Sequence, residues 1–476
     1  MNDMENLHKE MHGLKANKEI FEQVKSYAYD YMDNIDERPV FPSDEALKGL
    51  DFFDEPLSDD PCSSSEILRL LHEYGSPATV AQSGGRYFGF VNGGAVPVSL
   101  AAKWLSDIWD QNFAMYVMSP IASQMEVICE KWLIDLFKLP EETAAGFVSG
   151  SSTAIICGLA AARNETFRRL NWDIGLKGIF GAPKLRIVLG EQAHASVFKA
   201  LVLLGFGQEQ IEIVPADNEG CMNTELLPKL DDHTIVIAQA GNVNSGAFDN
   251  FEAICSAANN ANAWVHIDGA FGLWSAASGS RKYLTKGIEN ADSWSVDAHK
   301  TLNAPYDNGI ILCKNRKALV TAMQASGSYL QYSNKRDGML YTTEMSRRNR
   351  AVELWATLKF LGKRGAEQLI DELCNHAQYF AEQLKTKGFH ILNEVVFNQV
   401  LVACDSPELT TATLVNIQKS GECWCGAAKW KGEPVIRVSV CSWITTKKDI
   451  DRSVNAFVKG CEEAKKTEDK TVKIRL

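Results

Sequence analysis

Between Gly146 and Lys314 the chain alternates short apolar runs with helical patterns, and this alternation limits the possible folds more than any other feature. Helical stretches separate several of the runs, as at Ser196–Leu204 and Asn250–Ala261. Strands that alternate with helices form a mainly parallel sheet with helices on both faces. The sequence therefore predicts an α/β domain with six strands at Leu185–Leu189, Ile211–Val214, Thr234–Ala238, Ala263–Ile267, Ser293–Val296 and Gly309–Cys313.

The regions on either side of this alternation differ in pattern. Residues 1–95 mix helical stretches with turns and are expected to form an N-terminal arm that packs on another subunit or on the large domain. The large domain is predicted at 96–345. Residues 346–476 begin with two long helical stretches broken near Gly362–Gly365, and strands are expected near Val400–Ala403 and Val435–Val440. A smaller C-terminal α+β domain is predicted there.

Composition narrows the class of protein. The 476 residues are 45% hydrophobic and 23% charged, with a net charge of −11, which argues against nucleic acid or an anionic membrane as the main partner. No apolar run is long enough for a transmembrane helix, and the first residues contain no signal-peptide core, so a cytoplasmic location is expected. The twelve cysteines form no second cluster beside Cys423 and Cys425, and no metal site is expected.

Polar side chains follow successive predicted strands and the start of a helical stretch. A serine-rich run from Ser149 to Thr153 precedes the helical stretch Ile155–Arg163, and amides at a helix start suit a phosphate. Taken alone, that run could be a plain helix cap, and a single histidine could cap a helix or lie in the core. Because the carboxyl ends of parallel strands share one edge, where open α/β sheets bind ligands, five such sites together indicate a ligand site. The other four are His194, the loop of Asn242, Asn244 and Ser245, then Asp268 and Lys300.

Asp268 and Lys300 end neighbouring predicted strands and lie 32 positions apart. This pair suits pyridoxal 5'-phosphate, because that cofactor needs a lysine that bonds to its aldehyde and a carboxylate that keeps its ring nitrogen protonated. The protonated ring accepts electrons from a breaking bond. The pair therefore favours an enzyme that uses this cofactor.

The residues around these positions resemble the group II pyridoxal-phosphate decarboxylases, within the aspartate-aminotransferase fold type (fold type I). The resemblance runs from about Gly84 to Val458. It implies a seven-stranded, mostly parallel sheet covered by helices, with a smaller C-terminal domain and an N-terminal helical arm. It rests on Ser149–Ala154, Gln192–Ser196, Gly241–Asp249, His266–Ala270, Asp297–Lys300 and Ser346–Arg348.

The resemblance also implies roles for individual residues. Lys300, His194 and Asp268 would be catalytic: Lys300 would carry the cofactor, Asp268 would pair with its ring nitrogen, and His194 would stack on its ring. Ala270 would lie on the other face of the ring. Ser151, Ser152 and Thr153 would hold the phosphate with His299 close by, and Ser245 would bond the cofactor or the substrate. Arg437 would lie at the substrate end, although a structural salt bridge on a strand remains an alternative. The remaining substrate contacts would come from Phe90, Asn92 and Tyr341.

The sequence departs from the family's aromatic-specific members in two regions. A loop after the lysine carries both Tyr332 and Tyr341, and either could be the acid that completes decarboxylation. Asn92 and two glycines stand where aromatic residues and a proline are expected, and Ala114 stands about where a phenylalanine is expected. These departures imply a roomier or more polar pocket, so acidic amino acids, diaminobutyrate and aromatic amino acids all remain possible substrates.

Three functions stay open on the sequence. The favoured one is decarboxylation of an L-amino acid to the amine and carbon dioxide. The second is another reaction on the same scaffold, by an aldolase, an aminotransferase or an aldehyde synthase, because one fold hosts many chemistries. The third is a non-catalytic homologue, which is expected to have lost Lys300 or Asp268. The resemblance further implies a homodimer with shared active sites.

Overall fold

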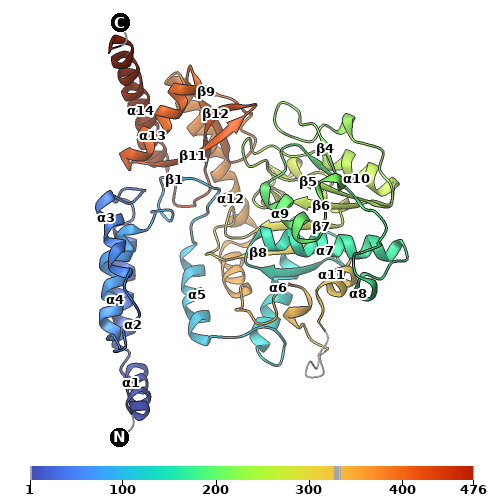
Figure 1. The fold of residues 1–476 in the computed structure, drawn as a ribbon, viewed down its shortest axis with the longest axis horizontal. Coiled ribbons are helices and arrows are strands. Elements are labelled where there is room, and N and C mark those ends of the chain that lie inside the picture. The colour runs from blue at the N-terminus through green and yellow to red at the C-terminus, as the bar shows by residue number, and fades with distance from the viewer. Residues whose placement is uncertain (1–2, 326–331, 333, 475–476) are drawn as a thin grey trace.

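The computed structural model describes residues 3–325, 332 and 334–474, with the side chains from 7 to 467 within those ranges, and has a seven-stranded sheet at its centre (Figure 1). The strand order is β2-β8-β7-β6-β5-β3-β4, and only β8 runs against its neighbours. The bounds are β2 Ala144–Val148, β3 Arg186–Gly190, β4 Ile211–Val214, β5 Thr234–Gln239, β6 Trp264–Asp268, β7 Ser293–Asp297 and β8 Gly309–Cys313. The fold class and all six predicted strands are confirmed, with bounds that differ by at most one residue.

The central strands are apolar throughout because both of their faces are buried. Val236 and Trp294 belong to one core with α6, α10 and α12, whereas Ile235 and Ile237 belong to a second core with α7, α9 and α11. Alternate residues of a strand thus enter opposite cores. The covering helices are α6 Pro120–Phe137, α7 Ser151–Arg169, α8 Ile174–Lys177, α9 Ala195–Leu203, α10 Phe251–Asn260 and α11 Arg316–Met323.

The long helix α12 (Ala351–Thr386) leads from the large domain into a second, smaller sheet. Its backbone leaves helical geometry at Gly362, where φ is 60°, and the predicted break near Gly362–Gly365 is confirmed. The smaller sheet has the order β1-β11-β12-β10-β9 and packs against α13 and α14. The bounds are β1 Tyr87–Phe88, β9 His390–Ile391, β10 Gln399–Ala403, β11 Trp424–Trp430, β12 Glu433–Ser439, α13 Pro407–Ser420 and α14 Lys447–Ile474.

Strand β1 belongs to the predicted N-terminal segment but pairs in parallel with β11 of the smaller sheet. Residues near 87 therefore hold the beginning of the chain against its C-terminal part. The domain limits at 95 and 345 remain predictions, because this pairing joins parts of the chain on both sides of them.

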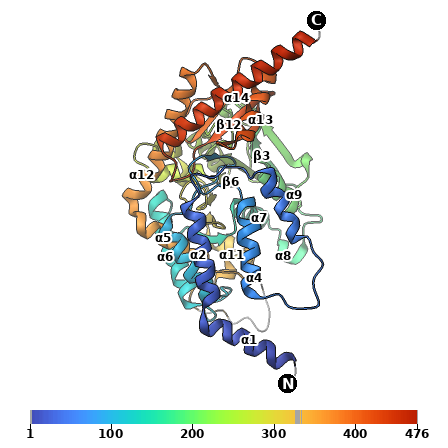
Figure 2. The same ribbon diagram turned by 90° about the vertical axis from the view of Figure 1, so that its left-hand side faces the viewer.

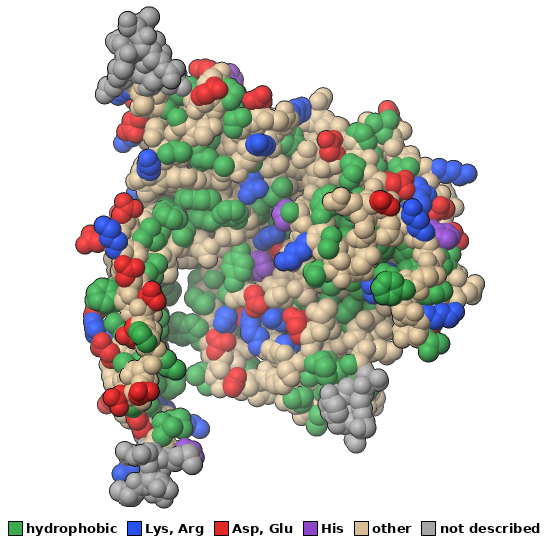
Figure 3. Space-filling model, in the orientation of Figure 1, with side chains coloured by type: hydrophobic (Ala, Val, Ile, Leu, Met, Phe, Trp, Pro, Cys, Tyr) green, Lys and Arg blue, Asp and Glu red, His purple; other side chains and the backbone are tan. Residues whose placement is uncertain are grey.

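The N-terminal helices form a column that lies beside α5 and extends away from the main body (Figures 1 and 2). Hydrophobic side chains line the side of the column that faces the body (Figure 3). A groove of about 360 Å³ runs between the two and includes Val24 and Leu71 from the column and Trp104 from α5. The bounds are α1 Asp3–Asn17, α2 Glu19–Asp33, α3 Asp44–Lys48, α4 Ser64–Leu70 and α5 Pro97–Trp109. Among the described residues, no helix has both the length and the apolar character needed to span a membrane.

His266 in β6 makes folding stability depend on pH. Its ring is fully buried, with Nδ1 2.8 Å from the Ser293 hydroxyl, and burial lowers its pKa to about 3. The unfolded chain binds a proton at this position below its ordinary pKa near 6.5, whereas the folded chain does not until about pH 3. Stability contributed by neutral His266 is therefore present above pH 6.5 and is lost as the pH falls toward 3.

The unfolding free energy of the wild-type protein should fall between pH 7 and pH 4. We expect a smaller fall in His266→Gln, because this variant lacks the one proton that only the unfolded chain binds at this position. Urea unfolding at several pH values measures this slope. His390→Gln is the matched control, because that histidine's side chain is 58% exposed. An identical slope in wild type and His266→Gln would contradict the account.

Candidate active site

The predicted polar residues meet at the edge of the sheet where β5, β6 and β7 end. Asp268 is the last residue of β6, and Lys300 follows β7 after a tight turn. The Nζ atom of Lys300 lies 3.0 Å from Oδ2 of Asp297, the last residue of β7. His194 precedes α9 and Ser151 begins α7, so two helix starts face the same edge.

Asp268 is a buried carboxylate, 5% exposed, with little inside the chain to balance its charge. Its Oδ1 accepts hydrogen bonds from the Ser295 hydroxyl and the Ala270 amide, both at 3.2 Å. Within the described part of the chain it forms no ion pair closer than 4.0 Å. Burial raises its pKa, against the opposing attraction of His194 and Lys300. Because a buried carboxylate is costly without a donor or cation, this site suits a ligand that brings an N–H group.

His194 caps helix α9 and also presents its ring to the crevice. Its Nδ1 accepts the Ser196 amide at 3.3 Å and lies 2.7 Å from the Ser196 hydroxyl. The side chain is exposed, yet the surrounding protein desolvates the imidazole enough to lower its pKa. The charges of Asp268 and Lys300 act on the same ring. The capping role and a free ring face therefore coexist, and a planar ligand can stack on that face.

The start of α7 provides the donors for an anion. Ser151, Ser152 and Thr153 are the first three residues of this 19-residue helix, and the Ser152 side chain is exposed. Gly309 at the start of β8 approaches Gly150 so closely that a Cβ on Gly309 would collide with the Gly150 backbone. Among the described residues, the Ser151 and Ser152 hydroxyls have no hydrogen-bond partner, and hydroxyls at a helix start suit a phosphate.

Asp297 joins this helix start to the lysine, a role that was not predicted from the sequence. Its Oδ1 accepts the Ser151 amide at 2.5 Å, while its Oδ2 pairs with Lys300. Burial disfavours the charged carboxylate, but Lys300 and His299 outweigh burial and lower the pKa of Asp297. The sequence feature that could have predicted this role is the position of Asp297 at the end of a strand, three residues before the lysine.

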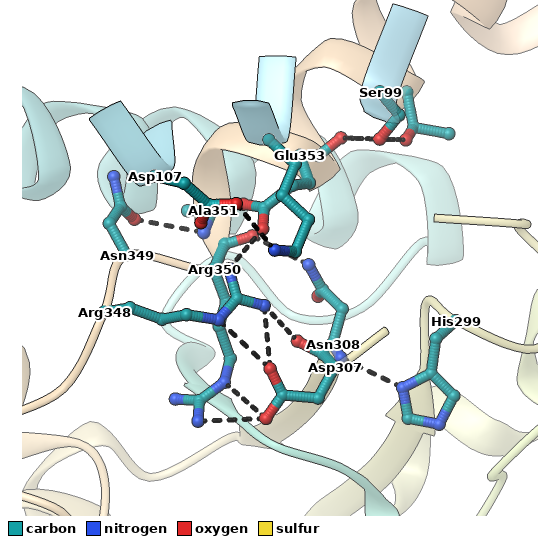
Figure 4. A network of polar contacts seen from close by, with 12 residues as sticks. Ser99, Asp107, His299, Asp307, Asn308, Arg348, Asn349, Arg350, Ala351 and Glu353 are labelled. Atoms are coloured by element: carbon teal, nitrogen blue, oxygen red, sulfur yellow. Dashed lines mark hydrogen bonds and ion pairs between the residues drawn. The ribbon is translucent and has the colours of Figure 1, made fainter. Parts of the chain in front are cut away.

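His299 is held rigidly behind the lysine. Its Nδ1 accepts the Asn308 amide at 3.0 Å, and its ring stacks on Tyr306 with the centroids 4.2 Å apart. Burial lowers the pKa of His299, although Asp297 opposes this effect. Figure 4 shows the network behind it, in which Asn308 donates to the Arg350 carbonyl and Asp307 pairs with Arg348 and Arg350. The network fixes the imidazole orientation beside Asp297.

Arg437 on β12 points to the crevice with unused hydrogen-bonding capacity. It is 9% exposed, its Nη1 donates to the Val243 carbonyl at 3.4 Å, and its buried Nε has no partner in the described structure. Burial lowers its pKa. Among the described side chains Arg437 forms no ion pair, so the alternative of a structural salt bridge is not supported.

An aromatic stack lies near Arg437. Tyr87, which interacts electrostatically with Arg437, stacks on Trp424, and Phe90 also stacks on Trp424, each with centroids 5.3 Å apart. The Phe90 side chain is 62% exposed. Asn92 instead links two parts of the chain: its Nδ2 donates to Gln82 at 2.8 Å and its Oδ1 accepts from the Tyr306 hydroxyl at 2.9 Å.

Comparison with known proteins identifies the family. The "Pyridoxal-dependent decarboxylase conserved domain" matches residues 53–403. The chain belongs to this family. It is 26% identical over 412 residues to the aromatic-L-amino-acid decarboxylase of Bacillus atrophaeus, covering 83% of each chain. It is 24% identical to the rat enzyme of the same name, covering 88% of this chain and 92% of that one.

Solved structures agree on the fold. The Oryza sativa TDC structure with PLP and tryptamine superposes with a TM-score of 0.86 at 20% identity, covering 94% of this chain and 98% of that one. Mouse CSAD gives 0.84 at 22% identity, over the same shares of the two chains. The family match makes the protein a member of the group II pyridoxal-phosphate-dependent decarboxylases, and its cofactor is pyridoxal 5'-phosphate. The buried Asp268, the free face of His194, the donors at α7 and the Lys300 amine all fit that cofactor.

Two predicted contacts of the decarboxylase are not supported by the geometry. The buried Ser245 hydroxyl donates to the Glu219 carbonyl at 2.6 Å, so it ties its own loop to the segment that follows β4. Tyr341 lies between Arg316 and Arg336, and its hydroxyl accepts from Arg316 at 3.2 Å. Arg316 also donates to the Thr143 carbonyl, just before the amino end of β2, so the Tyr341 hydroxyl lies toward the amino ends of the parallel strands, whereas Lys300 follows the carboxyl end of β7.

The structure also describes the other loop tyrosine, Tyr332, and the positions where the sequence departs from the family's aromatic-specific members. The Tyr332 hydroxyl donates to the Ala325 carbonyl at 2.5 Å, and residues 326–331 and 333 lie outside the described part of the chain. Ala114 is buried against Met115 and Met339. A Cβ on Gly93 would collide with the Lys300 carbonyl, so this glycine allows close packing and does not enlarge the pocket as expected. The inference of a roomier or more polar pocket therefore gains no support from Gly93 and stays a prediction.

We expect Asp268→Asn to retain bound cofactor but to lower kcat by at least about 100-fold, because an amide cannot keep the ring nitrogen protonated. Visible absorption reports the bound cofactor, and steady-state kinetics report the rate. Asp249→Asn is the matched control, since Asp249 is a buried carboxylate whose hydrogen-bond donors, among the described residues, are the amides of Met222 and Gln239. A kcat within twofold of wild type for Asp268→Asn would show that this carboxylate does not act on the cofactor.

Proposed function

We propose that this protein decarboxylates an L-amino acid to the corresponding amine and carbon dioxide. The observation that carries the proposal is the convergence of the Lys300 amine, the unbalanced Asp268 carboxylate and the exposed His194 ring at one sheet edge, in a member of a decarboxylase family. When bound, pyridoxal 5'-phosphate supplies an electron-withdrawing ring that stabilises the charge left by the departing carboxylate.

The residues divide the work of holding that cofactor. Lys300 would hold it covalently, and Asp268 would accept a hydrogen bond from its protonated ring nitrogen. His194 and Ala270 would lie on its two faces, while Ser151, Ser152 and Thr153 would hold its phosphate at the start of α7 with His299 nearby. Asp297 receives the Lys300 ammonium group whenever the lysine is not bonded to the cofactor. The 3.0 Å ion pair between Asp297 and Lys300 supports this last role.

Arg437 orients the substrate. Its buried guanidinium has no anionic partner in the described part of the chain, and a carboxylate from the substrate would supply one. Orientation selects the reaction, because the bond held perpendicular to the cofactor ring breaks most easily. Phe90 and Asn92 border the same side of the site, Phe90 as an exposed ring and Asn92 through Tyr306.

We propose an aromatic L-amino acid as the substrate. The exposed Phe90 ring, stacked on Trp424 beside Arg437, offers an apolar surface for a ring, and aromatic pairs add about 0.5–1.5 kcal/mol beyond burial. The curated relatives named above are aromatic-L-amino-acid decarboxylases. An acidic amino acid is the second candidate, favoured by the unpaired Arg437. Conversion of the substrate to an aldehyde is the alternative reaction, since the 4-hydroxyphenylacetaldehyde synthase of Rhodiola rosea, at 19% identity, has the same fold.

A substrate panel tests the proposal. The cofactor-loaded protein is offered tryptophan, tyrosine, dopa, glutamate, cysteine sulfinate and 2,4-diaminobutyrate, while carbon dioxide, amine, aldehyde and keto acid are measured together. We expect carbon dioxide and amine in equal amounts, with the highest kcat/KM for an aromatic substrate. Lys300→Ala is the inactive control. Aldehyde or keto acid as the main product would overturn the reaction, and preference for glutamate or cysteine sulfinate would overturn the substrate class.

We also propose that two copies of the chain associate and share their active sites. The apolar groove between the N-terminal column and α5, and exposed side chains such as Phe21, Ile108 and Val117, provide a large apolar surface that a second copy would cover. Analytical ultracentrifugation should give twice the chain mass, and a monomer at micromolar concentration would contradict this.

The described cysteines are all free, which supports a reducing compartment such as the cytoplasm.

A further inference from the structure

Asn303, three residues after the lysine, is a buried amide that contacts three separate parts of the chain. It is fully buried, and its Oδ1 accepts the amides of Gly94 at 2.7 Å and Trp443 at 2.9 Å. Its Nδ2 donates to the carbonyls of Thr301 and Cys441, each at 2.9 Å, and to that of Lys300 at 3.3 Å. One side chain therefore uses all of its donors and acceptors to hold backbone groups.

The segments that Asn303 joins carry the two sides of the site. Gly94 follows Phe90 and Asn92, and Trp443 follows β12, which carries Arg437. The Asn303 backbone reinforces this arrangement, because its carbonyl accepts the Val96 amide at 2.9 Å and its amide donates to the Lys300 carbonyl at 3.0 Å. Any movement of the lysine turn against the substrate side would break several of these bonds together.

Only a short list of residues can fill this position. The Asn303 backbone lies in the left-handed region, with φ at 60°, which asparagine tolerates better than most residues. Aspartate has the same shape but cannot donate to the three carbonyls, and glycine keeps the backbone but has no side chain. The position thus requires both an amide and a left-handed backbone.

We propose that Asn303 is the positioning residue that sets the distance between Lys300 and the substrate side of the pocket, and that it thereby controls orientation of the bond that breaks. This inference rests on the proposed function. Asn303 acts only through the backbone of Lys300, Gly94 and Trp443, with no direct contact to substrate or cofactor required.

The test compares Asn303→Gly and Asn303→Asp with wild type as cofactor-loaded proteins. Asn393→Asp is the matched control, because Asn393 is also a buried amide that donates to backbone carbonyls, those of Ser245 at 2.8 Å and Gln399 at 3.1 Å, and its hydrogen bonds in the described structure involve neither the lysine turn nor the segments of Gly94 and Trp443. Hydrogen–deuterium exchange of the peptides around Gly94 and Trp443 reports the contacts directly. Steady-state kinetics, with amine and keto acid measured separately, report how the substrate is oriented, because the two products come from breaking different bonds.

We expect Asn303→Gly to exchange faster at both peptides and Asn303→Asp to weaken the turn, with the visible band of the lysine-bound cofactor retained. A small displacement at a reacting centre can cost about 100-fold, so we expect kcat/KM to fall by roughly 10- to 100-fold and the keto acid fraction to rise. The Asn393→Asp control should change neither the exchange at these peptides nor the product ratio.

Two results would overturn the inference, and both differ from failure of the proposed function. Unchanged exchange in Asn303→Gly would mean that the amide does not hold the segments. Faster exchange with kcat, KM and product ratio within twofold of wild type would mean that the contact is only structural. Failure of the proposed function would instead appear as a wild-type protein that releases no carbon dioxide from any amino acid.

Discussion

The parallel register of β5, β6 and β7 is the constraint from which the site follows. Gln239, Asp268 and Ser295 lie side by side on the three strands, so β5 and β6 end at the same level and β7 ends two residues farther on, at Asp297. All three strands direct their next residues into one crevice. Register in a buried sheet is fixed because a slip by one residue would turn the apolar side chains to the wrong face. The position of the lysine turn is therefore set by the core packing of residues such as Val265 and Trp294, which are fully buried.

The charges at this edge are arranged to be completed by ligands. Two buried carboxylates lie close together, and only Asp297 has a cation of its own, Lys300. Asp268 has two neutral donors, and Arg437 has a carbonyl and an unused Nε. An incomplete polar network is costly for folding, and such sites occur where function requires them. The cofactor and the amino acid would together supply the missing partners.

Much of this was predictable from the sequence, for a physical reason. A strand buried on both faces must be apolar along its length, so β8 was predicted to the residue, and the polar groups just after such strands had to meet at one edge. Gly362 broke the helical pattern and also breaks α12. These features depend on local sequence or on sheet topology.

The remaining features depend on contacts between distant residues, which no local pattern specifies. Ser245 was expected to bond the cofactor or the substrate, but its hydroxyl donates a hydrogen bond to the Glu219 carbonyl, 26 residues away. The partners of Asn303 lie 209 residues before it and 138 residues after it. Gly93 was expected to leave room in the pocket, but a side chain at this position would point at the Lys300 carbonyl. Such roles become visible only when the folded chain brings the segments together.

The most direct test of the account is the covalent attachment of the cofactor. The protein loaded with pyridoxal 5'-phosphate is reduced with borohydride, digested, and analysed by mass spectrometry for the lysine that carries the pyridoxyl group. The account predicts that this lysine is Lys300 and that no other peptide is labelled to a comparable extent. Labelling of a different lysine, or none at all, would contradict the assignment of this sheet edge as the active site.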